Sequence, residues 1–175
     1  MLKLFALPDM NTVALLLGTN MGYRLRNLDS AIDEIGKIAG KIMRVSKVYE
    51  TAPWGNPDQD NFLNQALLIE TELKPQVLLK EILDIEKKLG RERAEKWGPR
   101  IIDIDILFYN EDIVYDHDLK IPHPFLQDRK FSLIALNEIS PNWKHPLFRK
   151  TVSEMLLECP DNNWVRVYNK AINEI

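Results

Sequence analysis

TVALLLGTN, residues 12–20, is the stretch of sequence that decides the fold. Its apolar run Thr12–Leu17 has the length of a strand and ends in a Gly-Thr-Asn turn, which is typical of a buried strand. Apolar residues then recur at helical spacing and predict an amphipathic helix that ends near Gly40. These residues are Leu25, Leu28, Ile32, Ile35 and Ile38. The first unit of the fold is therefore a strand, a turn and a helix.

A second unit of strand and helix follows a loop. A strand at Ile42–Glu50 leads into TAPWGNPDQDN, residues 51–61, whose Pro, Gly and Asn residues favour a loop. Phe62–Thr71 is predicted to be the next strand, and Pro75 begins a helix that ends at Gly90. The apolar stripe of this helix is Leu78, Ile82, Ile85 and Leu89.

The remaining predicted elements are shorter. Ile101–Tyr109 alternates apolar and polar residues and passes through a polar turn into Ile113–Tyr115, which predicts a hairpin. Phe131–Glu138 and Thr151–Glu158 have helical patterns, and Trp164–Tyr168 is predicted to be an edge strand.

The order β-α-β-β-α-β predicts an α+β fold, a ferredoxin-like two-layer sandwich. In it, two helices cover one face of a mainly antiparallel sheet and leave the other face free. We interpret residues 1–175 as a single domain and expect residues 1–11 to be a loose extension. Because ferredoxin-like sheets occur in enzymes, regulatory modules and RNA binders, the function has to be inferred from the site.

Composition excludes several classes of protein. Of the 175 residues, 45% are hydrophobic and 28% are charged, which is the balance of an ordinary globular domain. The net charge of -3 leaves no global positive field that would attract nucleic acid or an anionic membrane. The one cysteine, Cys159, cannot form an internal disulfide, and no apolar run is long enough to span a bilayer. We expect a cytoplasmic protein.

Two aspartates in the predicted strand 101–109 form the first candidate site. Asp103 and Asp105 are two residues apart, so their carboxylates project from the same face of the strand. The isoleucines that alternate with them project from the other face. Like charges in this arrangement repel unless a cation neutralises them, and Mg²⁺ prefers oxygen ligands of this kind. The alternative is a pair of solvated aspartates on an edge strand.

Four cations precede the aspartates and surround a rigid Trp-Gly-Pro turn. They are Arg91, Arg93, Lys96 and Arg100. Because guanidinium groups bind phosphate oxygens in pairs, cations beside a metal-binding carboxylate pair favour a nucleotide polyphosphate as ligand. The alternative is a set of surface ion pairs, which contribute about 0 to 1 kcal/mol each. Glu86 could orient one arginine or a ribose hydroxyl, or it could be a solvated helix residue.

GRERAEKWGPRIIDIDILFY, residues 90–109, resembles the signature of the 6-hydroxymethyl-7,8-dihydropterin pyrophosphokinases. Four further segments resemble this family in the same order. They are LLGTNMGYRLRNLDSAI (16–32), SKVYETAPWG (46–55), NFLNQALLIET (61–71) and IPHPFLQDRKFSLIALNEISP (121–141). The resemblance runs from about Val13 to Pro141. It implies an enzyme of the folate pathway that transfers pyrophosphate from ATP to the pterin hydroxymethyl group and releases AMP.

The resemblance also implies roles on the ATP side of the site. Asp103 and Asp105 would hold two Mg²⁺ ions that bridge the ATP phosphates and the incoming hydroxyl, and Arg91 and Arg93 would lie on a mobile catalytic loop. The implied ATP-binding residues are Glu86, Arg91, Arg93, Trp97, Arg100, Ile106, His123 and Arg129. Taken without the family, His123 between two prolines would be interpreted as a turn residue.

On the pterin side, the resemblance implies that Asn64 provides a hydrogen-bonding amide and that the pterin stacks between Phe62 and Phe131. The loop residues Thr51, Ala52 and Trp54 would read the edge of the pterin. Without the family, the two phenylalanines would be assigned to the core. Stacking on a flat heterocycle contributes roughly 0.5 to 1.5 kcal/mol beyond burial.

The expected partners are therefore ATP and the reduced pterin, bound by a monomer or weak homodimer. The sequence departs from the family pattern at Lys96, in a shortened loop, and at Asp118 and Lys120. Two other hypotheses remain from the residues alone. One is another Mg²⁺-dependent nucleotide-using transferase, and the other is a non-catalytic ferredoxin-like module that binds a small ligand.

Overall fold

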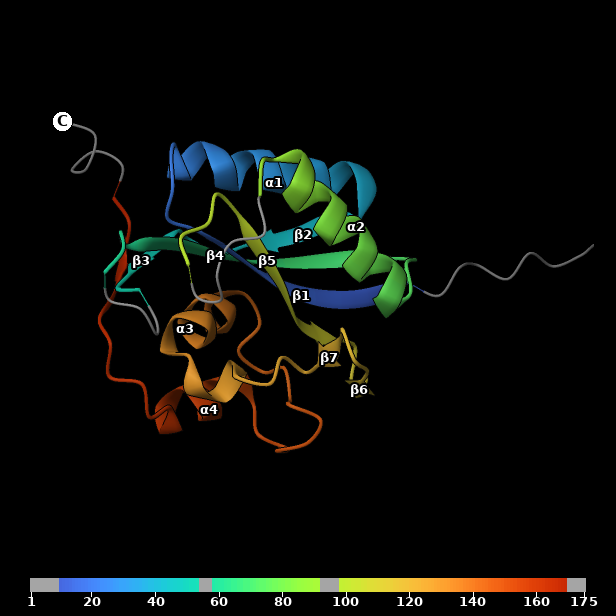
Figure 1. Ribbon diagram of the computed structural model, residues 1–175. Coiled ribbons are helices and arrows are strands. Elements are labelled where there is room, and N and C mark those ends of the chain that lie inside the picture. Colours follow the sequence, from blue (N-terminus) through green and yellow to red (C-terminus); the bar gives the residue numbers. More distant parts are fainter. Residues whose placement is uncertain (1–9, 54–57, 92–97, 170–175) are drawn as a thin grey trace, which may run out of the picture.

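The structure, a computed structural model, describes residues 10–53, 58–91 and 98–169 (Figure 1). Its strands are β1 (Asn11–Thr19), β2 (Lys41–Val45), β3 (Tyr49–Thr51), β4 (Phe62–Thr71), β5 (Asp103–Tyr109), β6 (Val114–Tyr115), β7 (Lys120–Ile121) and β8 (Val165–Val167). Its helices are α1 (Arg24–Ile38), α2 (Pro75–Lys88), α3 (Lys130–Ile139) and α4 (Val152–Glu158), with a short 3-10 helix at Leu126–Asp128.

Strand β1 is an inner strand of a six-stranded sheet. It is antiparallel to β4 on one side and to β5 on the other, and the strand order is β5-β1-β4-β3-β8. Strand β2 also pairs with β4, beside β3. Residues Val13 to Leu17 of β1 are buried, as the apolar run predicts. The predicted fold class, α+β with a ferredoxin-like and mainly antiparallel sheet, is confirmed.

Helices α1 and α2 cover one face of this sheet (Figure 1). Their apolar stripes pack on alternate residues of β1, so that Leu15 and Leu17 share a core with Leu28 and Ile82. Helix α2 begins with Pro75 in its first turn, as predicted. The helix ends at Lys88, three residues before Arg91, which lies beside Asp103 at the start of β5.

The second face of the sheet is covered by α3, with α4 packed against α3, so the expectation of a free face is wrong (Figure 1). Leu16 and Phe108 pack there against Leu133, Leu136 and Met155. The physical reason lies in the same apolar run that predicts β1. A strand with one solvated face alternates apolar and polar residues, whereas a continuous apolar run buries both faces.

The strand predicted at Ile42–Glu50 is divided into β2 and β3 in the structure. Ser46 lies between them, where its backbone N–H donates to the carbonyl of Ala66 and its Oγ accepts from the Ala66 N–H. The side chain therefore takes part in the hydrogen bonding that a strand residue would provide. Both short strands remain paired with β4.

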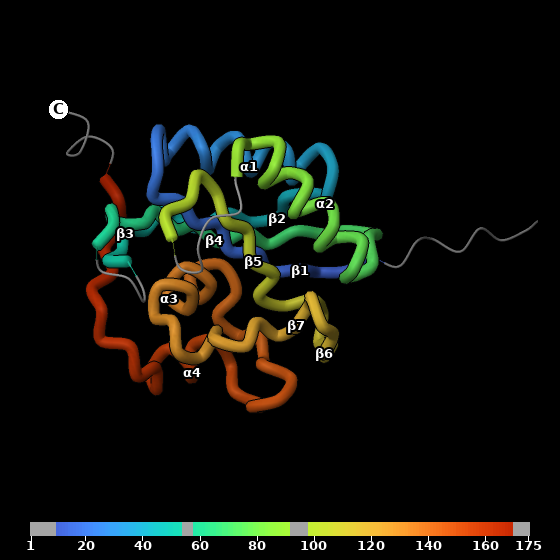
Figure 2. The backbone as a smooth tube through the Cα atoms, in the orientation of Figure 1, coloured from blue at the N-terminus to red at the C-terminus, as the bar shows by residue number. Residues whose placement is uncertain are grey.

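The predicted hairpin between 101–109 and 113–115 is also wrong. Strand β6 pairs with β7, with Val114 opposite Ile121, and not with β5. Asn11, expected in the N-terminal extension, already belongs to β1, and residues 1–9 of that expected extension lie outside the described residues. The predicted edge strand near the C-terminus is confirmed as β8, which lies beside β3 (Figure 2). Within the described part of the chain, no helix has the length and apolarity of a membrane span.

Candidate active site

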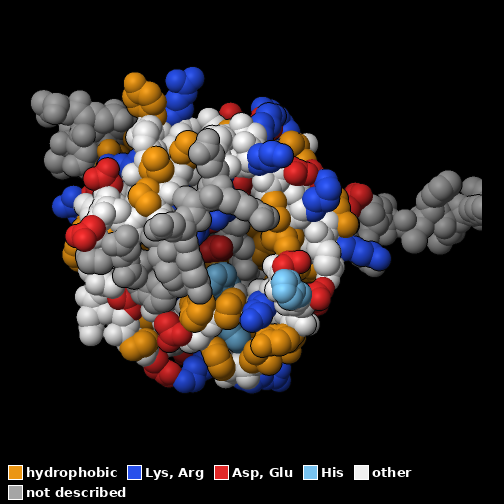
Figure 3. Space-filling model, viewed as in Figure 1, with side chains coloured by type: hydrophobic (Ala, Val, Ile, Leu, Met, Phe, Trp, Pro, Cys, Tyr) orange, Lys and Arg blue, Asp and Glu red, His pale blue; other side chains and the backbone are white. Residues whose placement is uncertain are grey.

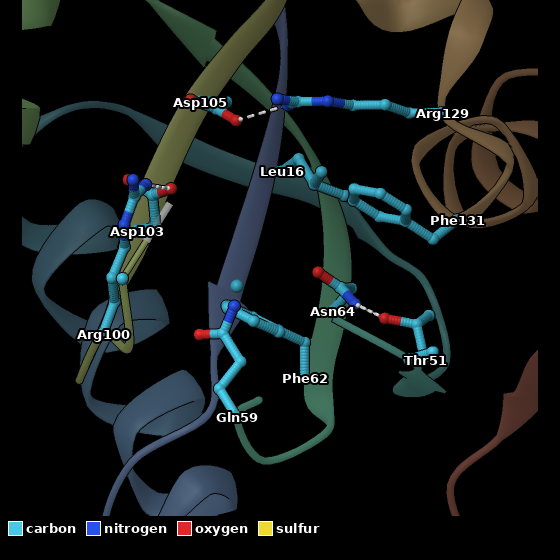
Figure 4. Close-up of a pocket in the computed structure, with 13 residues that line it drawn as sticks. Leu16, Thr51, Gln59, Phe62, Asn64, Arg100, Asp103, Asp105, Arg129 and Phe131 are labelled. Atoms are coloured by element: carbon cyan, nitrogen blue, oxygen red, sulfur yellow. Dashed lines mark hydrogen bonds and ion pairs between the residues drawn. The ribbon is translucent and has the colours of Figure 1, made fainter. Parts of the chain in front are cut away.

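A cavity opens at the end of the sheet where β1, β4 and β5 meet the start of α3 (Figure 4). The predicted site residues that line it are Thr51, Ala52, Phe62, Asn64, Arg100, Asp103, Asp105, Arg129 and Phe131. In the space-filling view, acidic and basic side chains and a histidine are visible deep in a hollow of this face (Figure 3). The structure thus places residues from both predicted halves of the site around one cavity. Trp54, Arg93 and Trp97 lie outside the described residues, as does Lys96.

The two aspartates extend from β5 into this cavity (Figure 4). Their side chains are 21% and 31% exposed for Asp103 and Asp105, whereas Ile104 between them is buried in the core on the opposite face. Burial raises the pKa of both carboxyl groups, and the charge of Asp105 further raises the pKa of Asp103. The pair therefore needs compensating positive charge.

Three guanidinium groups provide that charge. Arg91 Nη1 lies 2.8 Å from Asp103 Oδ1, and Arg100 forms an ion pair with the other oxygen of the same carboxylate. On the far side, Arg129 Nη1 lies 3.4 Å from Asp105 Oδ2, and its side chain is 10% exposed. The three arginine side chains are 25% exposed or less and each pairs with an aspartate, so the ion pairs of this cluster are partly buried.

Glu86, on α2, lies beneath this cluster. Its side chain is 2% exposed, Oε1 accepts a hydrogen bond of 2.7 Å from the Ile104 N–H, and Oε2 pairs with Arg91. Burial raises the pKa of Glu86 to about 7, although the Arg91 charge opposes this shift. The solvated alternative is therefore wrong for this residue. Glu86 instead orients Arg91 toward Asp103.

The Glu86→Gln variant should reveal this buried charge as a change in the pH dependence of stability. The folded-state pKa of about 7 lies above the ordinary 4.5, so the free energy of unfolding of the wild type falls between pH 4.5 and 7. Gln carries no charge at either end of this window. The free energy of unfolding of the variant, measured relative to that of the wild type, should therefore increase by up to about 3 kcal/mol from pH 4.5 to pH 8.

Urea unfolding of the protein without nucleotide, at pH 5 and pH 8, measures this difference. Asp84→Asn, which removes an exposed carboxylate from the same helix, is the control for the loss of one negative charge. Equal differences between Glu86→Gln and the wild type at the two pH values would contradict the assignment.

His123 and Ile106 line a second pocket, which shares Asp105 with the first. His123 Nε2 lies 3.7 Å from Asp105 Oδ2, while Nδ1 accepts a hydrogen bond from the Phe125 N–H. Burial, followed by the charge of Arg129, lowers the pKa of His123 to about 4, so the ring is neutral at pH 7. His123 is therefore both a turn residue and part of the site. Further residues of this pocket are Leu79, Leu119, Asp118 and Lys120.

The opposite end of the cavity has the composition that a flat heterocycle requires. Asn64 is buried, and its Nδ2 donates a hydrogen bond of 2.9 Å to Thr51 Oγ1, which leaves Oδ1 as an acceptor. Figure 4 shows the rings of Phe131 and Phe62 on either side of this amide. Gly18 lies close by, where a Cβ atom would come within 3.2 Å of Asn64 Oδ1. A side chain at residue 18 would therefore narrow the pocket.

One residue that the sequence reasoning missed connects the two ends of the site. Asn20 is buried, its Oδ1 accepts a hydrogen bond of 2.7 Å from the Arg100 N–H, and its Nδ2 donates to Gln59 Oε1 at 3.1 Å. Gln59 and Leu16 also line the cavity and were missed. The position of Asn20 in the sequence could have indicated a role in the site, because polar residues in the loop directly after a buried strand often bind ligands. From the sequence, Asn20 was assigned only to a turn.

The fold and this site define an enzyme that transfers phosphate groups. The carboxylate pair with its guanidinium groups is suited to bind a polyphosphate, and the amide between two aromatic rings is suited to bind a flat heterocyclic acceptor. The model of the family 7,8-dihydro-6-hydroxymethylpterin-pyrophosphokinase (HPPK) matches residues 14–141. The chain belongs to this family, which confirms the resemblance found in the sequence.

Individual relatives agree with this assignment. The 2-amino-4-hydroxy-6-hydroxymethyldihydropteridine pyrophosphokinase of Aquifex aeolicus is 46% identical over 145 residues, which cover 83% of this chain and 90% of that protein. The Folic acid synthesis protein FOL1 of Dictyostelium discoideum is 40% identical, but the match covers only 23% of its length. The wild-type HPPK-DHPS structure of Plasmodium falciparum has a TM-score of 0.71 at 19% identity, covering 86% of this chain and 45% of that one. This structural likeness shows the fold alone.

Proposed function

We propose that the protein transfers pyrophosphate from ATP to the hydroxymethyl group of 6-hydroxymethyl-7,8-dihydropterin, a step of tetrahydrofolate biosynthesis. The products are AMP and the pterin diphosphate. The observation that carries this proposal is that the carboxylate pair and the amide with its two aromatic rings line one cavity. Membership of the HPPK family supports the same reaction.

The donor set on β5 fits Mg²⁺. Asp103 and Asp105 offer carboxylate oxygens on one face of a strand, and burial makes their charges costly without a cation. Among the described residues, no group of three or more His, Cys, Asp or Glu side chains could enclose a metal ion. The remaining ligands would therefore be phosphate oxygens and water, and we propose two ions. When bound, Mg²⁺ neutralises phosphate charge and lowers the pKa of the attacking alcohol.

The arginines bind and orient the phosphates of ATP. Arg91, Arg100 and Arg129 surround the aspartates from three directions, and guanidinium groups bind phosphate oxygens as readily as carboxylates. His123 is a neutral ring at pH 7, and its Nε2 lies 3.7 Å from Asp105 Oδ2 and 3.5 Å from Arg129 Nη1, on the side of the proposed phosphate site. These groups stabilise negative charge that spreads over the phosphoryl oxygens during transfer.

The pterin side positions the attacking oxygen. Thr51 Oγ1 accepts one of the two N–H groups of the Asn64 amide and so orients it, and the carbonyl oxygen of that amide accepts from an N–H of the pterin. Phe62 and Phe131 fix the plane of the ring. The hydroxymethyl oxygen then attacks the β-phosphorus of ATP in line, and the bond between that phosphorus and the oxygen of the leaving AMP breaks.

Incubation with MgATP and the reduced pterin should yield AMP and the pterin diphosphate in equal amounts. Separation of both products by liquid chromatography with mass detection measures this outcome. Addition of EDTA in excess should abolish turnover, and excess Mg²⁺ should restore it. Formation of ADP, or of free pyrophosphate with a nucleotidylated acceptor, would support another transferase, and binding without turnover would support a ligand-binding module.

We further propose that the enzyme is cytoplasmic and acts as a monomer or weak homodimer. The single cysteine and the negative net charge support a reducing compartment without nucleic acid or membrane as partner.

A further inference from the structure

The C-terminal strand β8 holds the outer edge of β3, whose last residue lines the pterin side of the cavity. In β3, Thr51 is paired with Phe62 of β4 on one side and with Val165 of β8 on the other. Beyond β8, the Tyr168 N–H donates a hydrogen bond of 2.8 Å to the carbonyl of Val48. Without β8, the three residues of β3 would form a short edge strand, which is easily displaced.

A buried carboxylate joins β3 to β8 a second time. The side chain of Glu50 is 7% exposed, and its Oε2 accepts two hydrogen bonds from Arg166, at 2.9 Å from Nε and 2.6 Å from Nη2. The Arg166 guanidinium also lies 5.2 Å from the centre of the Trp164 ring. A paired guanidinium contact fixes both the charge and the orientation of the carboxylate.

A second cation, Arg24, connects Glu50 to the residue before Phe62. Arg24 Nη1 lies 3.4 Å from Glu50 Oε1 and donates a hydrogen bond of 2.8 Å to the carbonyl of Asn61. Asn61 directly precedes Phe62, one of the two aromatic rings. The Arg24 guanidinium also lies over the ring of Tyr168, with its carbon 5.8 Å from the ring centre. The C-terminal segment therefore supports the ends of both β3 and β4 that face the pterin.

We infer that Arg166 is a positioning residue that acts through Glu50 to set the affinity of the site for the pterin. This inference rests on the proposed function. Thr51 Oγ1 orients the amide of Asn64, so a displacement of β3 would misalign the group that reads the pterin. The aspartates lie on β5, at the opposite end of the sheet from β8, so binding of ATP should be affected little. Strand β8 also lies outside residues 14–141, which the family model matches.

Arg166→Gln tests the inference, because it removes the charge and the paired hydrogen bonds on Glu50. We expect the KM for the pterin to rise about fivefold, with kcat and the KM for MgATP changed less than about twofold. Arg166→Lys keeps the charge but loses the paired geometry, so it should rescue part of the pterin affinity. Initial rates of AMP formation, with each substrate varied separately, measure all three constants.

Lys150→Gln is the matched control, since it breaks an exposed ion pair with Glu158 that is remote from the cavity. It should leave both KM values unchanged. An unchanged pterin KM in Arg166→Gln would overturn the inference, as would an equal rise of both KM values with a fall in melting temperature. Should Arg166→Gln fail to fold, an unchanged pterin KM in Arg166→Lys would overturn it. A wild-type enzyme that forms no AMP contradicts the proposed function instead.

Discussion

Replacement of Asp103 by Asn should lower kcat by at least about 10³-fold, which corresponds to about 4 kcal/mol of lost transition-state stabilisation. Asn has the same size but no charge, so it is a weak ligand for Mg²⁺ and leaves Arg91 and Arg100 without their shared partner. Arg100 would then lose its carboxylate partner, and Arg91 would be held by Glu86 alone. Rapid measurement of AMP formation at saturating pterin and MgATP gives kcat directly.

The Asp103→Asn variant should remain folded. The substitution removes the repulsion with Asp105 while it loses two ion pairs, so we expect its melting temperature within about 5 °C of the wild type. Asp112→Asn, in the exposed turn after β5, is the matched control and should keep full activity. A folded Asp103→Asn enzyme that retains more than a tenth of the wild-type kcat would mean that the metal site lies elsewhere.

Replacement of Asn64 by Leu should affect the other substrate. In the proposed complex, the buried amide, which Thr51 orients, accepts a hydrogen bond from the pterin, and Leu has nearly the same volume without either polar atom. We expect kcat/KM for the pterin to fall about 100-fold, since a polar substrate edge is then desolvated without a partner. The KM for MgATP should stay within about twofold of the wild type, because β1 lies between β4, which carries Asn64, and β5, which carries the aspartates.

Asn137→Ala is the control for the loss of an amide, since Asn137 bonds to Ser153 between α3 and α4. It should leave the kinetic constants unchanged. If Asn64→Leu instead raised the KM for MgATP as strongly as that for the pterin, Asn64 would not belong to a separate pterin pocket.

The sequence predicted the elements that depend on local pattern. The run Thr12–Leu17, the helical stripe that begins after it and the strand Phe62–Thr71 are all present, because each buries residues at the period of its own backbone. The position of Asp103 and Asp105 on one face also follows from the spacing of two residues. For the chemistry of the second substrate, the resemblance to the family was needed, since Phe62 and Phe131 alone would be assigned to the core.

The sequence by itself determined that β1 is a buried strand, that Phe62–Thr71 is a strand, and that the two aspartates share a face opposite to core isoleucines. Only the tertiary structure decided that α3 covers the second face, that β6 pairs with β7, and that Glu86 is buried beneath Arg91. It also decided that Asn20 and the pair of Glu50 with Arg166 connect the walls of the cavity. The physical reason is that the period of the apolar residues indicates which side chains are buried. Which segment each buried side chain packs against depends instead on contacts between residues that are distant in the sequence.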